Sequence, residues 1–191
     1  MSGGTPADRR ESLRKLLAGT VRRGTFTLAS GKTSDFYFDG RLITLAANGM
    51  VQVARVINDV LAARADSATI TAVGGPTMGA DPIAASVCVI AQTEYGRAWD
   101  SFIVRKEAKG HGAGKLIEGP PLTAASHVVL VEDVVTSGGS VLKAVDAVRA
   151  TGAAVVCVIP LLDREEGAAE AFRAAGVELV PLFRRSELPP A

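Results

Sequence analysis

The sequence contains little cysteine. Two cysteines occur in 191 residues, Cys88 in the apolar stretch IAASVCVIA and Cys157 in VVCVI, and neither has a CxxC neighbour. Such contexts are typical of buried, reduced thiols. The pattern predicts core packing for both side chains and argues against redox or metal roles.

The chain also lacks an excess of charge and a long hydrophobic run. Its 21 basic and 20 acidic residues leave a net charge of +1, so no global field would attract nucleic acid or an anionic membrane. No apolar run reaches membrane-spanning length, and MSGGTPADRRESLRKLL contains no apolar segment of the signal-peptide type. We therefore expect a cytoplasmic protein without nucleic-acid or membrane partners, in which any anion site is local.

Aromatic residues are scarce and unevenly distributed. They make up 5% of the chain, yet half of the six phenylalanines and one of the two tyrosines fall between residues 26 and 38. Residues 24–28 and 35–39 predict two strands separated by a turn, which would form an N-terminal hairpin or hood. By composition these aromatic side chains fill a minor core, and stacking against a flat ring is the alternative.

The hydrophobic fraction of 48% is sufficient for the core of one domain. Apolar periodicity predicts helices at 6–18, 48–64, 83–92, 141–152 and about 167–175, and strands at 68–73, 101–104, 127–131, 153–162 and 177–183. This alternation predicts an α/β fold with a mostly parallel sheet covered by helices on both faces. We expect one domain over residues 1–191, with a small hood at about 20–45 and an α/β core at 46–183.

The most informative stretch is HVVLVEDVVTSGGSV, residues 127–141. Its apolar run has no polar alternation, which is typical of a central strand buried on both faces. Residues 136–140 then combine hydroxyls and glycines before a helix whose N-terminal N–H groups and dipole attract anions. Glu132 and Asp133 would repel an anion unless the ligand also carries hydroxyls that bond to carboxylates, so the stretch indicates a sugar phosphate. An ordinary strand and capped helix is the alternative.

Two further loops are predicted at the same edge of the sheet. Backbone amides around residues 77–79 would suit a diphosphate, although an ordinary βα turn explains the spacing equally well. Residues 105–115, RKEAKGHGAGK, combine four cations and a histidine with glycines. They form either a solvated basic loop or a mobile cationic cover for a leaving diphosphate. Arg164 follows a later strand, where the alternative to a ligand contact is a salt bridge to Glu165 or Glu166.

Together these motifs resemble the type I phosphoribosyltransferases, in which an apolar strand leads into two acids and a Thr-Ser/Ala-Gly turn. Within them the chain most resembles the orotate phosphoribosyltransferases, over about Phe26 to Arg164. FTLASGKTSDFYFDGR is similar to their N-terminal signature, RKEAKGHG to their catalytic loop, and LLDREEG to the segment with the base-binding arginine. The resemblance implies the type I phosphoribosyltransferase fold. It also implies transfer of phosphoribosyl from 5-phosphoribosyl 1-diphosphate to orotate, which gives orotidine 5-phosphate and diphosphate in pyrimidine (UMP) biosynthesis.

The resemblance implies a role for each motif. Glu132 and Asp133 would face the ribose hydroxyls. The 5-phosphate would be wrapped by Val134, Val135, Thr136, Ser137, Gly138, Gly139 and Ser140, and the diphosphate bound by Thr77, Met78 and Gly79. The catalytic group would be Arg105, Lys106, Lys109 and His111, with Lys109 as the main cation. Orotate would be held by Thr136, Arg164, Tyr37 and Phe38.

The resemblance further implies Mg²⁺ held mainly by diphosphate and ribose oxygens, and a homodimer in which residues 105–115 reach the neighbouring site. Two departures from the family pattern remove a lysine each, at Ala29 and at Met78. Lys32, Lys115 or backbone amides are the candidate replacements. The competing hypotheses are transfer to another base and, less favoured, a non-catalytic sensor of phosphoribosyl diphosphate.

Overall fold

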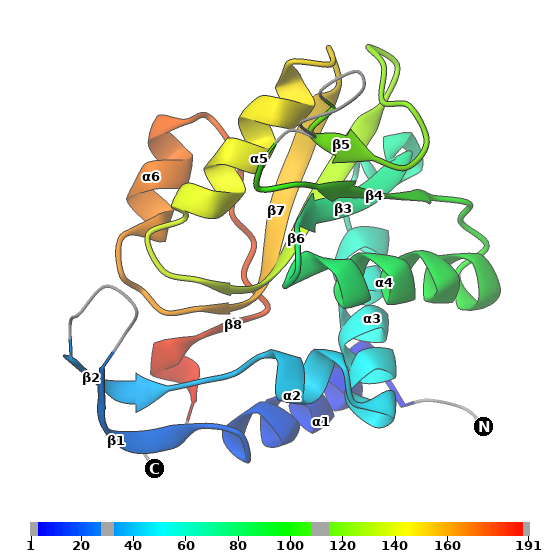
Figure 1. Ribbon diagram of the computed structural model, residues 1–191. Coiled ribbons are helices and arrows are strands. Elements are labelled where there is room, and N and C mark those ends of the chain that lie inside the picture. The colour runs from blue at the N-terminus through cyan, green and yellow to red at the C-terminus, as the bar shows by residue number, and fades with distance from the viewer. Residues whose placement is uncertain (1–3, 28–32, 108–114, 189–191) are drawn as a thin grey trace.

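The computed structural model describes residues 4–27, 33–107 and 115–188. A six-stranded sheet lies between two layers of helices, and a separate two-stranded hairpin lies beside the carboxyl edge of the sheet (Figure 1). The helices are α1 (Pro6–Ala18), α2 (Arg41–Thr44), α3 (Ala47–Ala62), α4 (Ala80–Glu94), α5 (Gly139–Arg149) and α6 (Ala168–Ala174). Short 3₁₀ turns occur at Ser67–Thr69 and Arg185–Glu187.

The hairpin pairs β1 (Arg22–Thr27) with β2 (Thr33–Tyr37) in antiparallel orientation. The main sheet has the order β5-β4-β3-β6-β7-β8. Its strands are β3 (Ala72–Pro76), β4 (Asp100–Val104), β5 (Ile117–Glu118), β6 (His127–Val135), β7 (Ala154–Asp163) and β8 (Phe183–Arg184). All neighbours are parallel except β5, which runs antiparallel to β4. The predicted fold class, a mostly parallel sheet flanked by helices, is confirmed.

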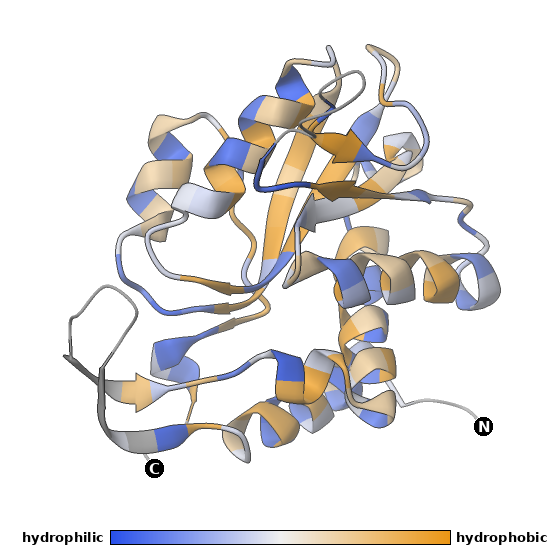
Figure 2. Cartoon of the chain, viewed as in Figure 1, coloured by the Kyte–Doolittle hydropathy of each residue, from blue (hydrophilic) through white to orange (hydrophobic). Residues whose placement is uncertain are grey.

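Strand β6 shows why its sequence lacks polar alternation. Val129 and Val131 pack into one core layer with α1, α3 and α4, while Val128 and Leu130 pack into a second layer with α5 and α6. All four side chains have no exposed surface. Each contributes roughly 1.5–3 kcal/mol by leaving water. Strands β6 and β7 are accordingly orange, and so hydrophobic, along most of their length (Figure 2).

The predicted helix at 6–18 is confirmed as α1, and its start has a local cause. The Thr5 hydroxyl accepts from the Asp8 amide at 3.3 Å, and the Asp8 carboxylate accepts from the Thr5 amide at 2.9 Å. This capping box satisfies two N–H groups that the helix itself leaves unpaired. Leu13 and Leu17 then bury the inner face of the helix completely.

The predicted strand at 68–73 is wrong, because β3 begins at Ala72 and includes the glycines that the sequence suggested were a loop. A Cβ on Gly74 would collide with the Phe102 carbonyl oxygen, and one on Gly75 with the Val131 carbonyl oxygen. Both glycines therefore lie in the strand because the neighbouring backbones leave no room for a side chain. The following helix also begins three residues earlier than predicted.

The predicted strand at 177–183 is also wrong. Residue Leu179 makes one isolated bridge to Val158, and regular pairing is limited to the two residues of β8. The Val180 amide donates to the Val158 carbonyl and the Leu182 amide to the Pro160 carbonyl, but Pro160 on β7 has no N–H to donate in return, which interrupts the ladder. The two-residue strand β5 had no signal in the sequence.

The cysteines follow the prediction of unreactive thiols. Cys157 is buried and Cys88 partly buried, and both are free. Burial raises the pKa of the Cys157 thiol to about 12 and that of Cys88 to about 11. In the described parts of the chain, no helix is long and apolar enough to cross a membrane.

Candidate functional site

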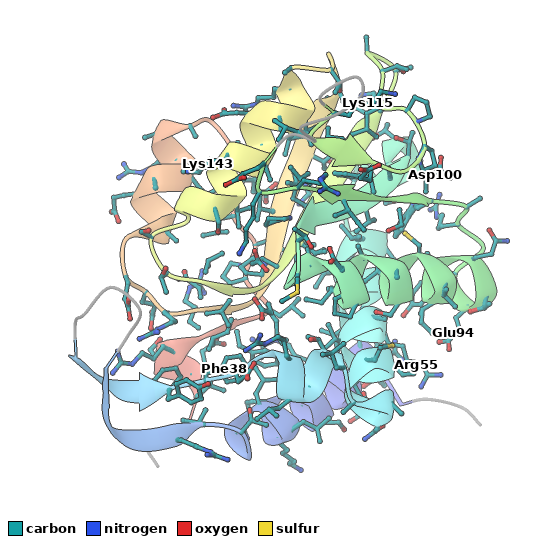
Figure 3. All side chains as sticks on the ribbon, in the orientation of Figure 1. Phe38, Arg55, Glu94, Asp100, Lys115 and Lys143 are labelled. Atoms are coloured by element: carbon teal, nitrogen blue, oxygen red, sulfur yellow. The ribbon has the colours of Figure 1, made fainter. Side chains whose placement is uncertain are left out.

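A cavity of about 980 Å³ lies between the hood and the carboxyl ends of β3, β4 and β6. This is the edge at which open α/β sheets bind ligands. The cavity is lined by residues 37–41, 76–79, 104–107, 116 and 132–134, and by residues 140, 143, 144 and 147 on α5. Four segments that are distant in the sequence thus face one space. Phe38 on the hood and Lys143 on α5 approach it from opposite sides (Figure 3).

Glu132 and Asp133 lie at the floor of this cavity, near the end of β6. Glu132 is only 6% exposed, and its carboxylate accepts from the Asp133 amide at 3.0 Å. Asp133 in turn accepts from the Val134 amide at 2.8 Å. Burial, and then the charge of Asp133, raise the pKa of Glu132 to about 9. Burial beside a second acid therefore favours the protonated form of Glu132 in the free protein.

Two glycines close around these acids from different elements. A Cβ on Gly79 would lie 2.6 Å from Asp133 Oδ1 and would collide with Glu132 Oε1. A Cβ on Gly40 in the hood would lie 2.9 Å from the Asp133 Cβ. A side chain at either position would force the acids to shift, so the loop after β3 and the hood both approach the acids at backbone distance.

The turn after β6 leads directly into the N-terminus of α5. Gly138 has a left-handed φ of 81° and is buried against Phe172, while α5 begins at Gly139 without a side-chain cap. The first N–H groups of α5 therefore remain available for an anion. Of residues 134–140, Val134 and Ser140 line the cavity, and the five residues between them are not part of its wall. Of these, Val135 and Gly138 are buried, and Thr136, Ser137 and Gly139 are exposed.

The predicted diphosphate loop, Thr77 to Gly79, lines the cavity as a continuous segment. The Thr77 amide donates to the Val104 carbonyl at 3.0 Å and is thus used by the sheet. Its hydroxyl donates to Asp81 at 2.8 Å, which fixes the loop to the first turn of α4. Only the amides of Met78 and Gly79 are therefore left for a ligand within this loop. The Met78 side chain is 66% exposed.

The first residues of the cationic segment 105–115 form part of the cavity wall. Arg105 and Lys106 line the cavity, and the base of the segment is closed by a bond of 2.8 Å from the Arg105 amide to the Leu116 carbonyl. The Arg105 guanidinium lies 3.5 Å from Glu118. Lys109 and His111, like Ala29 and Lys32, lie outside the described residues.

The hood aromatics are divided between the core and the cavity. Phe36 is 1% exposed and belongs to the core, whereas Tyr37 and Phe38 line the cavity. The difference arises because the chain leaves β2 at Tyr37 and bends over the carboxyl edge of the sheet.

Arg164 lies next to this region but is not part of the cavity wall. Its backbone amide donates to the Val135 carbonyl at 3.0 Å. Its guanidinium pairs with Glu166 at 2.8 Å and lies 5.7 Å from the centre of the Phe36 ring. The salt bridge foreseen as the alternative is therefore present, although Arg164 is buried rather than on the surface.

Several cavity residues had no place in the sequence motifs, notably Lys143. It follows Ser140 by three residues on α5 and precedes Ala147 by four, so these residues share one helical face. Among the described residues Lys143 has no ion-pair partner. Helical spacing from Ser140 would have found it once the strand-turn-helix unit was recognised. Asp39 and Arg41 also line the cavity and pair at 2.9 Å, which lowers the pKa of Asp39.

A divalent cation fits this site only together with a ligand. The described residues contain no group of three or more histidines, cysteines or acids that could hold a metal ion. Glu132 and Asp133 supply carboxylate oxygens at one end of the cavity. Mg²⁺ is usually bound by one or two carboxylates together with substrate phosphates and water. The donor set therefore suits Mg²⁺ that takes most of its ligands from a phosphorylated substrate.

Comparisons with known proteins give a consistent result. A model of the phosphoribosyl transferase domain matches residues 47–173. The orotate phosphoribosyltransferase of Rhodopirellula baltica is 48% identical over 164 residues, which cover 85% of this chain and 84% of that protein.

The structure resembles that of the Mycobacterium tuberculosis H37Rv orotate phosphoribosyltransferase in complex with Fe(III) dicitrate. The TM-score is 0.81 at 37% identity, and the match covers 95% of this chain and 99% of the other. The structure of that enzyme in complex with 5-phospho-alpha-D-ribosyl 1-diphosphate matches with a TM-score of 0.75 at 34% identity, over 93% and 97% of the two chains.

Proposed function

Because this chain belongs to the orotate phosphoribosyltransferase family of type I phosphoribosyltransferases, we propose that it transfers phosphoribosyl from 5-phosphoribosyl 1-diphosphate to orotate. The products are orotidine 5-phosphate and diphosphate, and the reaction belongs to pyrimidine (UMP) biosynthesis. A solved relative binds the same phosphoribosyl donor.

One observation carries this proposal. The acids Glu132 and Asp133, the loop Thr77 to Gly79 and Ser140 in the uncapped first turn of α5 all line one cavity. A helix N-terminus suits the 5-phosphate, the loop suits the diphosphate, and carboxylates suit the ribose hydroxyls between them. A ligand with two phosphate groups separated by a diol matches this order.

The chemistry requires stabilisation of a leaving group more than proton transfer. As the diphosphate leaves, C1 of the ribose gains positive charge and the leaving oxygens gain negative charge. Arg105 and Lys106 line the cavity. Lys109 and His111 follow them in the sequence, and we assign Lys109 as the main catalytic cation and His111 as a further catalytic residue. Cations held near the developing charge lower the barrier. Asp133 and Glu132 bind the ribose and do not act as a general acid/base pair.

Mg²⁺ is the proposed cofactor, held mainly by diphosphate and ribose oxygens with Glu132 and Asp133 nearby. When bound, it supplies charge neutralisation for the leaving diphosphate. No side chain is required as a direct ligand of the metal in this proposal, and the two acids act on the ribose hydroxyls.

A homodimer is the proposed assembly, with residues 105–115 reaching the neighbouring site. Support comes from exposed apolar side chains near the cavity mouth: Leu42 is 54%, Leu45 62% and Met78 66% exposed. Their burial against a second copy would remove apolar surface from water. Light scattering coupled to gel filtration tests this directly. The proposed location is the cytoplasm, where Cys88 and Cys157 would remain reduced.

The decisive experiment is an assay of the purified protein with 5-phosphoribosyl 1-diphosphate, Mg²⁺ and a panel of bases. Turnover of orotate, lost on addition of a chelator, is the expected result. Turnover of adenine or uracil but not orotate would contradict the proposed base, and binding of the donor without any turnover would indicate a sensor.

A further inference from the structure

The C-terminal turn Arg185–Glu187 contacts the segment that carries Arg164. The Ser186 amide donates to one carboxylate oxygen of Glu165 at 2.8 Å, and the Ser186 hydroxyl donates to the other at 3.0 Å. One residue of the turn therefore holds both oxygens of the side chain that follows Arg164 directly.

Glu165 has an unusual backbone conformation. Its φ of 59° makes it the one non-glycine residue with positive φ in the described chain. Such a conformation is uncommon for a residue with a side chain and persists where the surroundings hold it. Its amide donates to the Asp163 carboxylate at 2.8 Å, and Asp163 is 3% exposed. Because Arg164 precedes Glu165 directly, the direction in which the Arg164 side chain leaves the backbone depends on this turn.

A second contact joins the same partners through the hood. The Arg185 guanidinium lies 5.0 Å from the centre of the Phe36 ring, and the Arg164 guanidinium lies 5.7 Å from it. Phe36 is 1% exposed, so the ring itself is held firmly by the core. Cations over an aromatic face are attracted by its quadrupole. The ring therefore restricts the position of both guanidinium groups.

From these contacts we infer that the C-terminal turn is part of the base site, with Arg185 and Ser186 as positioning residues for Arg164. The inference deepens the proposed function and rests on it, because that function assigns Arg164 to the carboxylate of orotate. A guanidinium binds a carboxylate best through two parallel hydrogen bonds, so a small rotation of its plane weakens the pair. Arg185 and Ser186 act through Phe36 and Glu165, whereas the phosphoribosyl donor is bound at other elements.

The test compares Arg185→Met, Ser186→Ala and the double variant with the wild type. We expect the KM for orotate to rise about threefold in each single variant and about tenfold in the double variant, the scale of one lost cation–π contact and one lost charged hydrogen bond. The KM for phosphoribosyl diphosphate is expected to change by less than about twofold, since its site does not involve this turn. Thermal unfolding midpoints are measured alongside.

Two further variants sharpen the result. Arg173→Met makes the same substitution at a position whose side chain is 79% exposed, and it should leave both KM values unchanged. Arg185→Lys keeps the charge without the planar guanidinium, so an intermediate KM for orotate is expected.

An unchanged KM for orotate in the double variant, or an equal rise in both KM values, would overturn the inference while orotate turnover by the wild type upholds the proposed function. Absence of orotate turnover in the wild type would refute both. If the double variant does not fold, Ser186→Ala alone decides, because it removes one hydrogen bond at the surface.

Discussion

Two regions of the proposed site are built in different ways. The proposed phosphoribosyl side, residues 77–79 and 132–140, consists of two segments that each continue from a buried parallel strand. The proposed base side, residues 36–38, 164–166 and 185–186, brings together the hood, the turn after β7 and the C-terminal turn, and of these residues Tyr37 and Phe38 line the cavity. One side is thus assembled from local motifs, and the other from segments that meet only in the folded chain.

This difference has a consequence for robustness. The phosphoribosyl side depends on backbone groups and glycines packed around the two acids, so it is sensitive to any added side chain. The base side depends on long side chains held by one another, such as Arg164 by Phe36 and Glu166. Substitutions should therefore separate the two sides by their effect on the two substrates.

The largest effect is expected on the phosphoribosyl side, from Lys109→Ala. Loss of one cation that stabilises the leaving diphosphate should lower kcat by about 10²-fold or more. Steady-state assays at saturating concentrations of both substrates measure this. A kcat near that of the wild type would contradict the assigned role.

The base side is tested by Arg164→Ala. Removal of the guanidinium should raise the KM for orotate roughly 30-fold, the scale of a lost charged hydrogen-bond pair, with little change in the KM for phosphoribosyl diphosphate. Equal losses for both substrates would show that Arg164 does not belong to a separate base side.

Gly79→Ala should damage the phosphoribosyl side through sterics alone. The added Cβ would collide with Glu132 and Asp133, so the KM for phosphoribosyl diphosphate should rise roughly tenfold, in line with the cost of overpacking. Gly19→Ala is the matched control, because a Cβ there has no neighbour closer than 3.5 Å. Normal kinetics in Gly79→Ala would show that the acids can move without cost.

Lys143→Met tests whether the unpaired cation on α5 serves the phosphoribosyl donor. Lys143 lies one helical turn beyond Ser140, so its charge would be near the proposed 5-phosphate site. The KM for phosphoribosyl diphosphate should therefore rise about threefold in the variant, and this KM should depend less on the salt concentration. Lys15→Met, on the exposed face of α1, is the control with the same charge change. An unchanged KM would exclude Lys143 as a replacement for the lysines absent at Ala29 and Met78.

The smallest effect concerns stability. The pKa of Glu132 is raised from 4.5 to about 9, so between these values the unfolded chain loses a proton that the folded protein keeps. Folding stability therefore falls as the pH rises through this window, and below it the group contributes nothing. Glu132→Gln should therefore raise the Tm near pH 8 by clearly more than it does near pH 5. Glu170→Gln, at an exposed position, is the control, and an equal gain at both pH values would contradict the shift.

Sequence reasoning found the elements of the fold well and their ends less well. Apolar periodicity predicted α1, α3 and α5, whose buried faces repeat at helical spacing. It failed at Gly74 and Gly75, because the sequence alone does not distinguish a glycine required by close packing between strands from a glycine in a turn. It also failed near Pro181, where an apolar segment that runs beside β7 does not form the regular strand that its composition predicted.

For the site, the sequence by itself determined the acids Glu132 and Asp133, the small-residue turn and the helix that follows, because contiguous residues of a strand-turn-helix unit have nearly one possible arrangement. Only the tertiary structure decided that Phe36 enters the core while Phe38 lines the cavity, that Lys143 lines the same cavity, and that the Arg185 and Arg164 guanidinium groups both lie near the Phe36 ring. These relations depend on how distant segments pack, and no local pattern encodes which side chain a buried ring will meet.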